Sequence, residues 1–139
     1  MPYFRKHDLK LYVIIYDKKL RGGVIYPRVP KYRMDDEDDY IKRICCSNSI
    51  AGCIRGIGDL TPIAIKYGNY YVYRLDLTGY EQVLTPRQVQ VSVPDAMQTG
   101  EWWVLNPCRC KYLGQIKSIC PRSNNYGKTI IRYTWEKVK

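Results

Sequence analysis

The stretch Tyr70-Tyr71-Val72-Tyr73-Arg74-Leu75 decides the fold class of this 139-residue chain. Its odd-numbered residues alternate with Val72 and Arg74, which is the period of a β-strand with two distinct faces. Tyrosine and valine are also residue types that strands favour. The sequence therefore predicts a strand here and a protein whose core is built on β-sheet.

The same alternation returns near the C-terminus, where Ile131, Tyr133 and Trp135 alternate with Arg132 and Thr134. Short segments rich in Tyr, Val and Ile occur throughout the chain, and 14 tyrosines stand against one phenylalanine. By these signals we expect six strands. They lie near residues 9–15, 42–46, 70–75, 102–105, 112–119 and 129–135.

One helix is well indicated, beginning after Ser47-Asn48-Ser49. Ser47 or Ser49 can cap its N-terminus with a side-chain oxygen. An apolar stripe at i, i+3, i+4 and i+7 follows, formed by Ile50, Cys53, Ile54 and Ile57. Gly58 can end the helix in the left-handed conformation.

These elements predict one small α+β domain over residues 1–139, mostly antiparallel β with one or two short helices. The length fits a single core. No apolar run approaches the ~20 residues that a membrane-spanning helix needs, so no membrane partner is expected. The N-terminal residues lack the pattern of a signal peptide, and we expect a cytoplasmic protein.

Six cysteines stand at positions 45, 46, 53, 108, 110 and 120. Disulfides are rare in a reducing compartment, and no pair has the C-x2-C spacing typical of zinc sites. Cys45 and Cys46 are adjacent, so on a strand their side chains point to opposite faces. We expect buried free thiols and no metal site.

The formal net charge of +10 favours polyanionic partners: nucleic acid, a nucleotide or an acidic protein surface. The cations are scattered along the chain and form no single block, a pattern that also suits an ordinary solvated surface. Five consecutive acids at 35–39 indicate an exposed loop. They lack the spaced ligands and the glycine of a calcium-binding loop.

Glu101 is the main candidate for a catalytic residue. It opens the apolar stretch Glu101-Trp102-Trp103-Val104, and a carboxylate at the mouth of a strand often orients a ligand or serves in catalysis. The alternative is a solvated first residue of the strand, paired with an Arg or Lys. The sequence leaves both interpretations open.

A second candidate is the turn Ser47-Asn48-Ser49, whose hydroxyls and first-turn N–H groups suit an anion, although simple N-capping is the more common role of such residues. If Glu101 lies across from these serines, the two segments flank a cleft. Arg28, Tyr32 and Trp102 are candidates to line it. Such a cleft can hold a nucleotide, with the base on an aromatic ring and a carboxylate on the ribose hydroxyls.

The order strand, Ser-x-Ser, helix and later strand-opening Glu resembles the ADP-ribosyltransferase superfamily, in particular its small phage and bacterial members. The matching stretches are Leu11-Tyr12-Val13, Pro27-Arg28-Val29-Pro30, residues 43–50 and residues 99–104. The resemblance implies a split sheet that binds NAD as cofactor. It further implies that Glu101 is catalytic and orients the nicotinamide ribose, with Arg28, Ser47, Ser49, Tyr32 and Trp102 supporting the NAD. Val13 stands where the family has Arg or His.

Two other functions remain open. The same scaffold can serve as a non-catalytic viral inhibitor of a host defence system, resembling anti-CRISPR proteins in role. Such an inhibitor would act in the host cytoplasm and bind a host protein or nucleic acid through its basic surface, or a nucleotide in the cleft. The aromatic and basic residues can alternatively bind single-stranded nucleic acid directly, by stacking and by charge.

Overall fold

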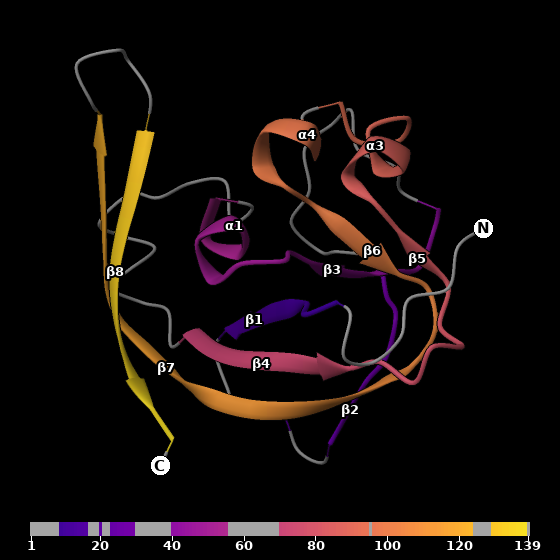
Figure 1. Cartoon of the computed structure of the whole chain (residues 1–139), viewed down its shortest axis with the longest axis horizontal. Coiled ribbons are helices and arrows are strands. Elements are labelled where there is room, and N and C mark those ends of the chain that lie inside the picture. Colours follow the sequence, from indigo (N-terminus) through magenta and orange to yellow (C-terminus); the bar gives the residue numbers. More distant parts are fainter. Residues whose placement is uncertain are drawn as a thin grey trace.

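The computed structural model describes residues 9–16, 20, 23–29, 40–55, 70–94, 96–123 and 129–138. Their strands form two antiparallel sheets, which Figure 1 shows as two layers. The first sheet has the order β1-β4-β7-β2, and β8 also pairs with β7. Its strands are β1 (Tyr12–Tyr16), β4 (Tyr70–Asp76), β7 (Cys108–Ser123), β2 (Val24–Ile25) and β8 (Thr129–Lys137).

The second sheet has the order β3-β6-β5 and is the part of the fold that carries the candidate site. Its strands are β3 (Ile44–Cys46), β6 (Trp102–Val104) and β5 (Val83–Leu84). Among the described residues, three short helices accompany the sheets: α1 (Ile50–Arg55), α3 (Pro86–Val89) and α4 (Ala96–Thr99). Figure 1 shows α3 and α4 above the second sheet, on the side away from the first sheet.

The predicted small α+β domain, mostly antiparallel β, is confirmed. Each of the six expected strands is present, with bounds shifted by a few residues, and β7 extends well beyond the predicted 112–119. β2 and β5 are two-residue strands that the sequence did not indicate.

Ser49 is the residue that caps α1: its Oγ accepts a hydrogen bond of 3.0 Å from the backbone N–H of Gly52. The apolar stripe is confirmed in part, because Ile54 is fully buried and Ile50 packs on the same core. Gly58, the predicted end of the helix, lies outside the described residues. Ser123 pairs with Thr129, and β7 and β8 form an antiparallel pair.

β3 joins the two sheets through backbone hydrogen bonds at both of its ends. Ser47 exchanges bonds of 2.7 and 3.1 Å with Tyr12 of β1, and Arg43 exchanges two bonds of 3.0 Å with Arg28, three residues beyond β2. Because β1 and β2 lie at opposite ends of the β1-β4-β7-β2 order, the first sheet curves until both of these ends reach β3.

The main core fills the space enclosed in this way. It combines Val13, Tyr73 and Leu75 of the first sheet with Ile44, Cys46 and Val104 of the second. A second cluster packs α1 against β4, β7 and β8, and a third places Trp103 beneath α3 and α4. No helix among the described residues is long and apolar enough to cross a membrane.

Candidate functional site

The antiparallel pairing of β3 with β6 brings two of the candidate segments together. Cys46 pairs with Trp102, and continuing this register by one residue places Ser47 opposite Glu101. The hydroxyl-bearing turn and the carboxylate therefore meet at one end of the second sheet, although 54 positions separate them in the sequence.

Glu101 is positioned by the end of α4. The N–H groups of Gly100 and Glu101 both donate to the Ala96 carbonyl, at 2.8 and 3.0 Å. Gly100 has a φ of 74°, the left-handed conformation that commonly ends a helix and that glycine adopts without strain. This turn directs the chain from α4 into β6, with Glu101 half-buried at the start of the strand.

The Ser47 hydroxyl lies at the centre of the site. The Ser47 side chain is 2% exposed, and its Oγ has no hydrogen-bond partner. A Cβ on Gly100 would lie 3.6 Å from this oxygen, and a Cβ on Gly52 of α1 would collide with it. The hydroxyl therefore occupies the small space between α1 and the turn before β6. A buried hydroxyl without a partner is unusual, because the unmade bond is costly.

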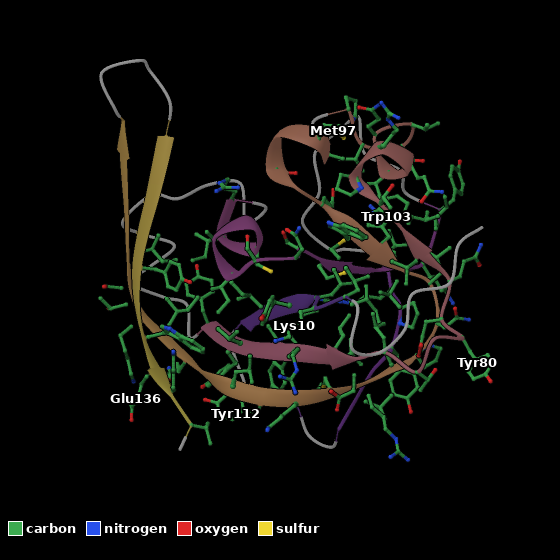
Figure 2. The ribbon with its side chains drawn as sticks, in the orientation of Figure 1. Lys10, Tyr80, Met97, Trp103, Tyr112 and Glu136 are labelled. Atoms are coloured by element: carbon green, nitrogen blue, oxygen red, sulfur yellow. The ribbon has the colours of Figure 1, made fainter. Side chains whose placement is uncertain are left out.

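Cys45 and Arg43 extend this polar group along β3. Burial raises the pKa of the Cys45 thiol to about 12, and the Glu101 carboxylate nearby raises it as well, while Arg43 lowers it. Arg43 is almost fully buried, and its guanidinium lies 4.4 Å from the centre of the Trp103 ring. Its Nη1 donates to the Ile41 carbonyl at 2.9 Å. Figure 2 shows Trp103 between the second sheet and the helices α3 and α4.

The other candidate residues lie elsewhere. Trp102 packs against the main core, whereas Trp103 belongs to the cluster under α3 and α4, so the neighbouring tryptophans face opposite sides of the sheet. Arg28 is exposed and pairs with Arg43, four residues along β3 from Ser47. That separation is roughly 13 Å of extended strand. Ser49 is engaged as the cap of α1. Tyr32 lies outside the described residues.

Sequence reasoning did not propose Arg43 or Cys45 as members of the site. The signal was present in the spacing of Arg43, Cys45 and Ser47, which occupy alternate positions and therefore share one face of a strand. Glu101 and Trp103 share a face of β6 for the same reason. Once the two strands pair, these side chains lie on the same face of the second sheet.

The expectation of free thiols is confirmed for the five cysteines whose side chains the structure describes: Cys45, Cys46, Cys53, Cys108 and Cys110. Cys45 and Cys46 face the third and the main core respectively, as expected for neighbours on a strand. Within the described ranges, no three His, Cys, Asp or Glu side chains gather where they could share a metal ion. The acidic run at 35–39 lies outside those ranges.

These features limit the chemistry of the site. A thiol with a pKa near 12 stays protonated at neutral pH, so Cys45 is not a nucleophile there. The Glu101 carboxylate accepts a hydrogen bond from the Cys45 thiol, and the Ser47 hydroxyl is buried. A half-buried carboxylate at the end of a strand can also accept hydrogen bonds from the hydroxyl groups of a ligand.

In comparisons with protein-family models, with curated proteins and with solved structures, no match to this chain was found.

Proposed function

We propose that this chain binds NAD or a related nucleotide at the end of the second sheet, in the manner of an ADP-ribosyltransferase. The observation that supports the proposal is the β3–β6 register, whose continuation brings Ser47 and the half-buried Glu101 to the same end of the second sheet. A ribose presents two neighbouring hydroxyls, and a carboxylate accepts hydrogen bonds from both. Glu101 is the residue that would hold the ribose.

Transfer of ADP-ribose would use the same carboxylate. The bond between ribose C1′ and the nicotinamide nitrogen breaks, and its electron pair leaves with the nicotinamide, whose ring becomes neutral. Positive charge then develops at the ribose, where Glu101 stabilises it electrostatically. Water or an acceptor nucleophile bonds to C1′ and releases its proton to solvent.

Binding without rapid turnover is the form of this function that the site supports best. Val13 occupies the position where the resembled family has Arg or His, and its side chain is 6% exposed within the main core. Arg28, the other candidate to grip the nucleotide, is exposed at the far end of β3. Loss of positioning groups lowers transfer rates strongly, while a carboxylate can still hold a ribose.

Calorimetric titration with NAD tests the binding. We expect saturable heat for the native chain and a loss of affinity of roughly tenfold or more for Glu101→Gln, since hydrogen bonds to a charged group are worth about 1.5–3 kcal/mol. Glu136→Gln is the matched control, because Glu136 is an exposed glutamate of β8 on the other sheet.

Nicotinamide release, followed by chromatography, separates binding from turnover. Release that Glu101→Gln abolishes would extend the function to catalysis. Absence of heat at millimolar NAD, with the native chain folded by circular dichroism, would refute the nucleotide site. An equal loss of affinity in the Glu101 and Glu136 variants would refute the role of Glu101.

A further inference from the structure

Cations that are far apart in the sequence meet on one face of the first sheet. Arg74 of β4 pairs with Lys111 of β7, and Asp76 pairs with Arg109. Leu75 donates a backbone hydrogen bond of 2.9 Å to Leu11, so the residue before Leu11, which is Lys10, lies next to Asp76. We call Lys10, Arg74, Arg109 and Lys111 the basic face.

These side chains point away from the main core. Arg109 and Lys111 are exposed and alternate with Cys108 and Cys110, which pack in or against that core. Lys10 is also exposed, and the Arg74 side chain is 34% exposed. Among the described residues of β1, β2, β4 and β7, Asp76 is the single acidic residue.

That acid neutralises little of the charge. The Arg74 guanidinium and the Asp76 carboxylate are 3.9 Å apart and both partly exposed, which makes a weak ion pair. Neighbouring strands are only about 5 Å apart, so the basic face concentrates positive charge on a small area. Such a surface attracts a chain of closely spaced anions.

An exposed aromatic ring borders the basic face. β2 is the next strand beyond β7, and Val24 pairs with Arg109. Tyr26 lies two residues beyond Val24 and therefore on the same side of the sheet, while Ile25 between them is buried. The Tyr26 side chain is 68% exposed, so its ring is open to a stacking partner.

We propose that the basic face binds single-stranded nucleic acid, with phosphates on the four cations and a base stacked on Tyr26. Lysine and arginine along a sheet together with an exposed aromatic ring are the elements with which proteins hold single strands. A single strand offers unstacked bases to Tyr26, whereas the bases of a duplex are stacked on one another. This surface belongs to the first sheet and does not depend on the Glu101 site.

Fluorescence anisotropy with a labelled single-stranded DNA of about 20 nucleotides, at low salt of about 50 mM, tests the proposal on the full chain. The double variant Arg109→Glu/Lys111→Glu should weaken binding at least tenfold. The control Arg55→Glu/Arg87→Glu reverses two exposed arginines at the ends of α1 and α3, and so changes the net charge by the same amount. We expect it to stay within threefold of the native affinity.

Salt dependence and stacking give two further readouts. For a single strand, removing one contact between a phosphate and a cation reduces the slope of log affinity against log salt by about 0.7, so the Arg109/Lys111 variant should show a slope smaller by about 1.4. Tyr26→Ala should weaken binding roughly tenfold with an unchanged slope, since stacking is worth about 1–3 kcal/mol per base.

Three results would overturn the proposal. The first is no binding by the folded native chain at this low salt. The second is an equal loss in the two charge-reversed variants, which would show attraction by net charge alone. The third is complete competition by heparin at the same anion concentration together with a neutral effect of Tyr26→Ala, which would show a site for polyanions in general.

Discussion

At the scale of single residues, the candidate site depends on two glycines that leave room for one hydroxyl. Gly52 leaves room for the hydroxyl because it has no side chain. A Cβ at this position would collide with Ser47 Oγ and lie 3.0 Å from Ser47 Cβ. Gly100 contributes its backbone conformation, with a φ of 74°. Ser47 is held between them without a hydrogen-bond partner for its Oγ. The position of this hydroxyl is therefore set by packing.

Gly52→Ala tests this packing. Alanine favours a helix by about 1 kcal/mol over glycine, so an uncrowded position would gain stability. At this crowded position we expect the free energy of unfolding to fall by about 2 kcal/mol, which is a typical cost of overpacking. Urea denaturation measures the change.

The matched control is Gly23→Ala, because Gly23 is exposed and its nearest contact for a Cβ would be the Cys110 carbonyl at 3.9 Å. It should change stability by less than about 0.5 kcal/mol. In a Ser47→Ala background the loss caused by Gly52→Ala should shrink, since the colliding oxygen is gone. A gain of stability in the native background would show that Ser47 does not sit against α1.

At the scale of elements, α3 is a four-residue helix that depends on its N-terminal cap. Thr85 accepts from the backbone N–H of Gln88, and the Gln88 side chain accepts from the N–H of Thr85 at 2.9 Å, which completes a capping box. Pro86 at the first position already has a helical φ. So short a helix has little internal hydrogen bonding, and its ends carry much of its stability.

Thr85→Ala should therefore lower the free energy of unfolding by about 1 kcal/mol, the usual effect of losing a cap. Thr85→Ser keeps the hydroxyl and should retain most of the stability. Thermal denaturation of the two variants makes the comparison. Equal losses in both would assign the effect to the threonine methyl group and not to the capping oxygen.

Elements of different length were predictable to different degrees. The alternation of residues 70–75 predicted β4 almost to its ends, because Tyr73 and Leu75 face the main core while Arg74 on the other face is partly exposed. β2 and β5 have two residues each and exist through their partners β7 and β6, so no local pattern indicates them. The Thr85-Pro86-Arg87-Gln88 signature of α3 was readable, whereas α4 has no comparable signal.

At the scale of the whole molecule, the register between paired strands decides which distant residues meet, and the sequence alone does not predict that register. The candidate site required that Ser47 and Glu101 meet, and the basic face required that Lys10, Arg74 and Arg109 meet. Both follow from pairings between segments that are distant in the chain. A one-residue slip of a strand would move each side chain to the other face, so composition and spacing alone cannot fix these groups.

The buried thiols give the whole fold a definite response to alkaline pH. Burial raises the pKa of Cys45, Cys53 and Cys108 to about 12, and it raises the pKa of Cys46 well above its usual value. In the unfolded chain a thiol has a pKa near 8.5. The folded state thus holds these protons more tightly, and the resulting stability is complete below about pH 8 and is lost as the pH rises towards 12.

We therefore expect the free energy of unfolding, measured in urea with a reductant, to be level between about pH 7 and 8 and to fall above about pH 9. Each fully buried thiol contributes a slope of about 1.4 kcal/mol per pH unit. Cys46→Ala removes one such thiol and should reduce the slope by that amount, although it lowers stability at every pH. Cys110→Ala, at a half-buried thiol, should reduce it less. A stability that stays level up to about pH 10 would mean that water reaches these thiols, and the closure of the first sheet by β3 would then be incomplete in solution.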